Sequence, residues 1–179
     1  MKRGMKYGTG TNTASLTIPE GHGQVVCESL WYTSPGAGTL VIYRVKQKAT
    51  ANAAVAADTA LVIDTDSAGK VGGAVLTTSD YVLVFDSGGT GGWQLSAVSA
   101  VAAVSSSTVS LTLGTAITCA AGDSVFVCRA ADIVTMVTAT ETQKDIRNAF
   151  NGFRAMPVHA VLAATGTCQF SAAYAYMDE

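Results

Sequence analysis

The chain has 179 residues, of which 49% are hydrophobic and 13% are charged, and its formal net charge is -2. This length suffices for a substantial core without disulfides or metal, and the small negative charge excludes the basic surface that nucleic-acid binding requires. The sequence contains no apolar run of the length needed to span a membrane, and no secretory signal is expected at its start.

Charge is scarce along the chain and absent from its middle. Residues 87–122 include no Asp, Glu, Lys or Arg. The charged fraction is about half of the roughly 25% usual for soluble domains. A protein with so few ionic groups is expected to have its exterior covered by neighbours, which indicates a component of an assembly.

The N-terminal segment 1–13 is predicted to be a flexible arm. It contains the one basic cluster of the sequence, Lys2, Arg3 and Lys6, followed by a run of Gly and Thr. Such an arm could become ordered on a neighbouring subunit by adding a strand to its sheet. We therefore include these three residues in the candidate interface.

Two strands are predicted next, over residues 24–32 and 39–48, joined by the turn Ser34–Gly38. Arg44, Lys46 and Lys48 alternate along the second strand and share one of its sides. This basic stripe is either a solvated sheet face or a docking stripe for an acidic protein surface.

A change to Ala-rich sequence after Lys48 predicts a second lobe, residues 50–132, built as a small β-barrel from short strands. Val98, Val101 and Val104 recur every third residue, which a helix would also satisfy, but the neighbouring pattern favours a strand. The strands are expected within residues 61–63, 74–77, 81–85, 93–104, 108–113 and 124–129.

The C-terminal part contains the only helix signal, a capping box from Thr140 to Gln143 that predicts a short helix near residues 141–151. After Pro157 the pattern returns to β, and Phe170, Tyr174 and Tyr176 share a face. The fold expected is mainly β: an antiparallel sandwich or jelly-roll-like lobe from residues 14–49 and 133–179, with the small barrel inserted.

No set of residues predicts catalysis, a cofactor or a resident metal. Asp64 to Gly69 begins like a calcium loop, but Ala68 and Val75 replace two of its ligands, so a solvated turn is favoured. His22 and His159 have no nucleophile motif near them, and Gly88–Gly92 lacks the Lys of a phosphate-binding loop. We expect neither an enzyme nor a small-molecule substrate.

The four cysteines, Cys27, Cys119, Cys128 and Cys168, are widely spaced and predicted to be buried thiols, although Cys119 and Cys128 could face each other across a hairpin. The tryptophans, Trp31 and Trp93, are either core residues or interface anchors. Trp93 completes the candidate interface.

The stretches Ser107–Leu113 and Ala121–Val125, together with the short terminal strand from Tyr174, resemble minor structural proteins of tailed bacteriophages, above all capsid decoration, or cement, proteins. The resemblance implies a β-sandwich or small barrel, a homotrimer, and the major capsid protein as partner. It implies a place on the capsid exterior of the virion, after synthesis in the host cytoplasm, and a role in fastening the expanded shell.

Two alternatives remain. A tail, adaptor or head-fibre subunit of the same particle would have the same composition. A carbohydrate-binding or host-adhesion module would instead use Trp31 or Trp93 to stack on a sugar ring.

Overall fold

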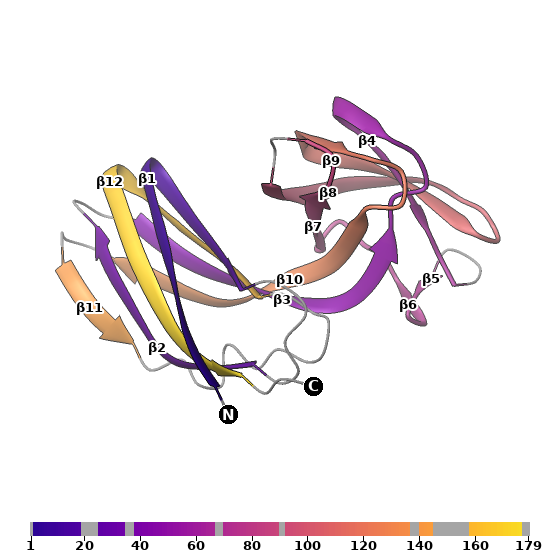
Figure 1. The fold of residues 1–179 in the computed structure, drawn as a ribbon. Helices are drawn as coiled ribbons and strands as arrows, with labels where there is room; N and C mark the ends of the chain where they lie inside the picture. Colours follow the sequence, from indigo (N-terminus) through magenta and orange to yellow (C-terminus); the bar gives the residue numbers. More distant parts are fainter. Residues whose placement is uncertain are drawn as a thin grey trace. The chain divides into compact units, whose positions relative to one another are not determined.

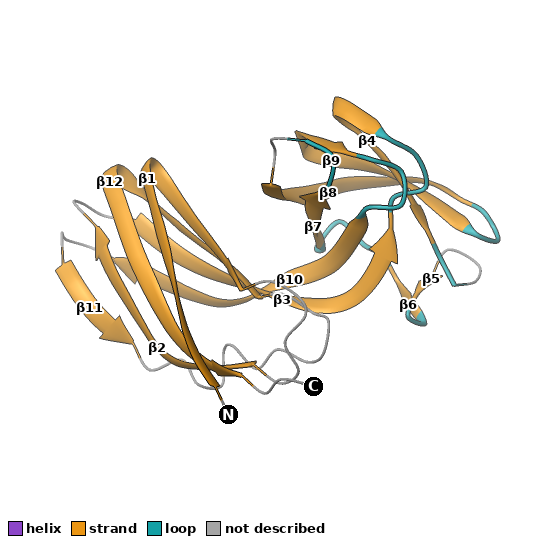
Figure 2. Ribbon diagram, in the orientation of Figure 1, coloured by secondary structure: helices purple, strands orange, loops and turns teal. Residues whose placement is uncertain are grey.

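The computed structural model describes residues 2–18, 25–34, 38–66, 70–89, 92–136, 140–144 and 158–176. Within these ranges the chain consists of antiparallel strands joined by turns, with no helix (Figure 2). The prediction of a mainly β chain is therefore confirmed. Among the described residues no helix exists that could cross a membrane.

The chain forms two compact units, residues 1–44 with 130–179 (unit 1) and residues 45–129 (unit 2). Two long strands, β3 (Gly38–Thr50) and β10 (Ser124–Met136), contribute residues to both units. Unit 1 also contains β1 (Lys2–Ile18), β2 (Val25–Ser34), β11 (Thr140–Lys144) and β12 (Val158–Tyr176). Unit 2 contains β4 (Val55–Asp64), β5 (Lys70–Val71), β6 (Ala74–Val75), β7 (Tyr81–Asp86), β8 (Gly92–Val104) and β9 (Thr108–Cys119).

In unit 1 the long strand β12 is flanked by β1 along one edge and by β3 and then β2 along the other. Figure 1 shows β1 and β12 side by side, both turning back midway. The β1 register shifts between Thr11 and Thr13, and Gly166 on β12 has a φ of 100°, a conformation that favours glycine. The bend brings two arms of one sheet to face each other.

The core of unit 1 contains residues from both arms. In the first arm, register aligns Ala14, Leu162 and Leu40 in one row and Leu16, Ala160 and Ile42 in the next. These side chains belong to the same buried cluster as Leu30, Tyr32, Cys168, Ala172 and Tyr174 of the second arm. Burial of apolar residues between the arms accounts for the alternation of residue types along each strand.

In unit 2 the antiparallel order β10-β7-β8-β9-β4 curves into a half-barrel. Backbone hydrogen bonds link its ends: Ala51 N donates to Asp123 O, Gly122 N donates to Ala51 O, and Ala51 bridges to Ile63. The core comprises one face of these strands, including Val82, Val84, Val98, Val109, Leu111, Leu113, Val125 and Val127.

Strand β8 confirms the strand expectation for residues 93–104 and explains its three-residue spacing. Val98, Val101 and Val104 are register partners of Leu113, Leu111 and Val109, so three residues of β8 lie opposite every two of β9. The register shifts between Val98 and Ala100 and between Val101 and Ala103 are β-bulges, each of which adds one residue to the strand.

Two expectations about local structure are corrected. Residues 2–13, expected to form a flexible arm, belong to β1, whose backbone pairs with β12 within the chain. Thr140–Lys144, expected to begin a helix, is strand β11 paired with Leu30–Ser34 of β2. In both places the backbone N–H and C=O groups form their hydrogen bonds with a neighbouring strand, a partner that the local sequence does not specify. The rest of the expected helix, residues 145–151, lies outside the described residues.

Candidate functional site

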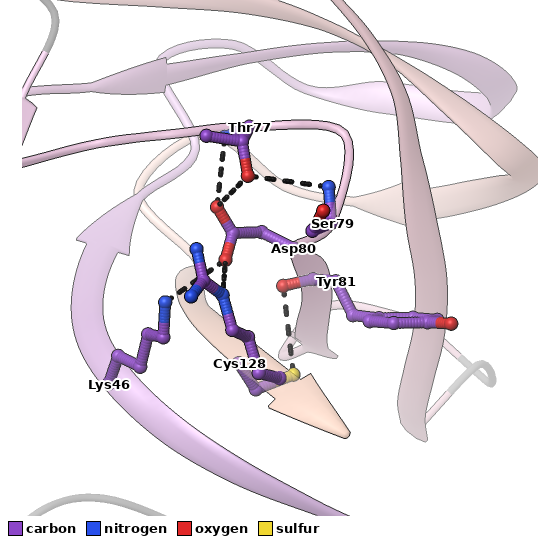
Figure 3. A network of polar contacts seen from close by, with 7 residues as sticks. Lys46, Thr77, Ser79, Asp80, Tyr81 and Cys128 are labelled. Carbon is purple, nitrogen blue, oxygen red and sulfur yellow. Dashed lines mark hydrogen bonds and ion pairs between the residues drawn. The ribbon is translucent and has the colours of Figure 1, made fainter. Parts of the chain in front are cut away.

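The polar centre of unit 2 is Asp80, a carboxylate only 2% exposed that lies immediately before β7. Its Oδ1 accepts hydrogen bonds from Arg129 Nε at 2.8 Å and from Lys46 Nζ at 3.2 Å (Figure 3). Its Oδ2 accepts from the Thr77 amide at 2.9 Å and the Thr77 hydroxyl at 3.2 Å. All of the hydrogen-bonding capacity of this carboxylate is thus directed to groups of the same unit.

The charge of Asp80 is stabilised by these donors. Burial alone would raise the pKa of Asp80, but the hydrogen bonds from Thr77, Arg129 and Lys46 outweigh it and lower the pKa below its ordinary value. A carboxylate held ionised and fully hydrogen-bonded is a poor general acid or base. The network therefore serves to connect β3, the turn before β7 and β10.

A second buried carboxylate, Asp123, organises the turn before β10. It accepts hydrogen bonds from the amides of Ala120 at 2.8 Å and Ser87 at 3.2 Å and from the Ser87 hydroxyl. Burial would raise the pKa of Asp123, but these hydrogen bonds lower it. Like Asp80, it has a structural role in this arrangement.

Three aromatic rings of unit 2 form a cluster beside these networks, here named the aromatic patch: Phe85 on β7, Trp93 on β8 and Phe126 on β10. Ring centroids are 4.9 Å apart for Phe85 and Trp93 and 5.8 Å apart for Trp93 and Phe126. Phe126 is fully buried, whereas Trp93 is partly exposed and Phe85 is 39% exposed. Lys48 Nζ lies 5.5 Å from the Phe126 ring centroid, within the range of a cation–π contact.

The structure brings some of the sequence-predicted interface residues together and separates others. Lys48 and Trp93 both lie against the Phe126 ring in the aromatic patch. Lys46 of the same basic stripe is bound to Asp80, so it already has an acidic partner within the chain. Arg44 is exposed on the unit 1 part of β3.

The N-terminal basic residues lie on β1 in unit 1. Lys2 and Arg3 are exposed, whereas Lys6 is partly buried in a register row with Ala172 and Leu30. The sequence did not point to Phe85 or Phe126 as members of a site. Their proximity to Trp93 depends on the pairing of β7 with β8 and β10, which the residue pattern does not specify.

The remaining sequence candidates occupy structural positions. Asp64 accepts hydrogen bonds from Thr50 and Asn52, and Asp66 accepts one from the Gly73 amide. The residues described contain no group of three or more potential metal ligands. His159 is buried with Nδ1 2.7 Å from Thr17 Oγ1, and burial lowers its pKa to about 4. His22 lies outside the described residues.

The buried-thiol prediction is confirmed for Cys119, Cys128 and Cys168, which are free and buried. Burial raises the pKa of Cys128 to about 12. Cys119 and Cys128 form no disulfide with each other in the described part of the chain. The side chain of Cys27 lies outside the described residues.

Comparison with known proteins gives no family assignment: no protein-family model matches the chain, and a search of curated proteins finds no match. The candidate site offers partly exposed aromatic surface and a cation, and its carboxylates are engaged in structural hydrogen bonds.

Proposed function

We propose that the chain is a non-catalytic structural protein of a virion that attaches to the outside of the capsid at subunit junctions and stabilises the shell, as a decoration protein does. The observation that carries the proposal is the aromatic patch, in which the Phe85 and Trp93 rings contact each other at an interplanar angle of 48° while both retain exposed surface. Large aromatic side chains of this kind are the usual anchors of protein interfaces.

The scarcity of charge supports the same function. Only 13% of the residues are charged, and an exposed apolar side chain also occurs at Val104, which is 56% exposed. If each protomer covers about 1,000 Å² of its surface on assembly, many weak contacts add, and symmetry multiplies them. Binding through repeated modest contacts gives avidity without a single tight site. The partners proposed are the major capsid protein and two further copies of this chain in a homotrimer.

For the fold, we propose that the two facing arms of unit 1 act as a β-sandwich and that unit 2 acts as a small barrel. The shared core of the two arms supports the first, and the hydrogen bonds of Ala51 to Gly122 and Asp123 support the second. Such closed β-architectures leave few open strand edges.

The test is co-sedimentation of the purified protein with expanded capsids that lack it, together with the thermal stability of the capsids and the solution mass of the free protein. We expect binding, a stabilised shell and a trimer. Trp93→Ala and Phe85→Ala should weaken binding by about tenfold each, because each removes an anchor worth about 1–2 kcal/mol. Val75→Ala, on the β5–β6 hairpin, is the matched exposed-apolar control and should bind like the parent.

Failure of the parent protein to sediment with the capsids would contradict the proposal. Binding that Trp93→Ala and Val75→Ala weaken equally would contradict the role of the aromatic patch. If a reconstructed particle shows this protein at the tail or neck instead of on the capsid, the protein is an adaptor or tail subunit.

A further inference from the structure

Unit 1 contains a pocket of about 340 Å³ on the face of its sheet opposite the core. It lies across three neighbouring strands, β1, β12 and β2, which run side by side (Figure 1). The residues of these strands that alternate with the core residues supply its polar and aromatic side chains. A volume of this size is at the lower end of the range typical of small-ligand sites.

Register places the lining side chains in two rows. Tyr7, Ser171 and Trp31 are opposite one another in the first row. Thr9, Gln169 and Thr33 form the second row, two residues along each strand. Because residues two apart in a strand share a face, all six belong to one face of the sheet.

The two aromatic residues stand on either side of Ser171. Tyr7 is 69% exposed and Trp31 is partly exposed, so both aromatic rings retain accessible surface. The core beneath them is complete without them, since Tyr32, Ala172 and Leu30 occupy the opposite face. Their exposure therefore leaves ring surface open to a ligand.

The polar side chains that line the pocket can also form hydrogen bonds with a ligand. Within the part of the chain that the structure describes, the side chains of Thr9, Thr33, Gln169 and Ser171 form no hydrogen bond with another residue. Gln169 offers both an amide donor and a carbonyl acceptor, and each hydroxyl can donate or accept. The described residues that line the pocket include no Asp, Glu, Lys, Arg or His.

We propose that this pocket binds a neutral carbohydrate, with one sugar ring stacked on Trp31 and its hydroxyls bonded to Gln169, Ser171 and the two threonines. A sugar ring has an apolar C–H face and polar edges, which match an aromatic surface bordered by amide and hydroxyl groups. The described lining offers a charged ligand no charged side chain, and a wholly apolar ligand would leave the polar side chains unpaired. This proposal does not depend on attachment to a capsid.

The experiment uses the full chain and four labelled neutral tetrasaccharides: β-1,4- and α-1,4-linked glucose, β-1,4-linked galactose and α-1,6-linked mannose. The chain has two tryptophans, so Trp93→Phe leaves Trp31 as the sole indole reporter. We expect at least one of the four to shift the Trp31 fluorescence of this variant saturably. Binding curves for the parent, followed by the labelled sugar, should give the same affinity.

Trp31→Ala should weaken binding by about tenfold or more, and Trp31→Tyr should retain most of it, since stacking needs an aromatic ring but not an indole. Tyr7→Ala tests the second ring without disturbing the core. Trp93→Ala is the matched control and should bind the sugar like the parent. Thermal unfolding of each variant checks that the fold is kept.

Absence of saturable binding to all four neutral sugars by the folded parent would overturn the proposal. So would binding that Trp31→Ala leaves unchanged, or preferential binding of a sulfated or sialylated form of the same sugar. If the parent protein does not bind capsids but does bind the sugar, the proposed function is overturned and this inference stands.

Discussion

Gly4 of β1 lies directly against the ring of Tyr174 of β12, its register partner. A Cβ added at Gly4 would lie 2.5 Å from Cζ and 2.6 Å from the hydroxyl oxygen of Tyr174. Tyr174 is 6% exposed and belongs to the core of unit 1. The glycine is thus required by the close approach of a buried ring to the backbone of β1, and it ties the N-terminal strand to the core.

Gly4→Ala is expected to destabilise the protein by about 1–3 kcal/mol, because the added methyl forces the Tyr174 ring or β1 to move. Chemical denaturation measures the loss. Gly88→Ala is the matched control, since a Cβ there has open space around it, and it should change stability by less than about 0.5 kcal/mol. Equal effects of the two substitutions would show that the contact with Tyr174 has no energetic importance.

Asp80→Asn should lower the free energy of unfolding by about 2–3 kcal/mol, because it removes a buried charge to which Arg129 and Lys46 donate. Since the folded pKa of Asp80 is depressed, its contribution is present above the unfolded pKa near 3.8 and is lost as pH falls through the folded value. Denaturation curves from pH 7 to pH 2 measure both effects. Asp58→Asn, at an exposed position on β4, should have little effect at pH 7.

His159 should make the protein less stable in mild acid. Its folded pKa of about 4 is below the ordinary value of 6.5, so the unfolded chain binds the proton first as pH falls. Stability should therefore decrease between about pH 6.5 and pH 4, by about 3 kcal/mol in all, and the contribution should not change further below that range.

The measurement is the difference in unfolding free energy between the parent and His159→Gln across this pH range. Gln keeps a polar partner for Thr17, whose hydroxyl lies 2.7 Å from the histidine Nδ1, but it does not titrate. The difference should change with pH between 6.5 and 4 and be constant above 7. If the unfolding free energies of the two proteins changed with pH in the same way, the burial of a neutral histidine would be contradicted.

The thiols of Cys119, Cys128 and Cys168 should resist modification in the folded protein. All three are buried, and the Cys128 pKa of about 12 leaves almost no thiolate at neutral pH. In a Cys27→Ser variant, 5,5′-dithiobis(2-nitrobenzoate) should react with three thiols only after a denaturant is added. Rapid reaction under native conditions would contradict this packing.

The valines of β8 show how far a residue pattern can be interpreted. Their spacing of three is compatible with a helix, whereas the residues around them favour a strand. The structure resolves the ambiguity with two β-bulges, which place Val98, Val101 and Val104 opposite alternate residues of β9. A bulge is defined by its partner strand, so the sequence of β8 by itself does not specify it.

For the segment beginning at Thr140, in contrast, the structure differs from the sequence prediction. A capping box predicts a helix from contacts within four residues. Here Thr140–Lys144 instead pairs with β2, a strand more than 100 residues earlier in the chain. Pairing to an existing sheet edge satisfies the same amides that the cap would have satisfied, and threonine is well suited to a strand.

The amino-acid sequence determined what depends on neighbours along the chain: the alternation that makes β-strands, the buried thiols and the shortage of charge. Only the tertiary structure decided which strands pair, that residues 2–13 complete a sheet, and that Trp93 meets Phe85 and Phe126 while Trp31 and Tyr7 border a separate pocket. The reason is physical. The alternation of side chains is a local property of an extended backbone, whereas strand pairing depends on edges that are brought together from distant parts of the chain.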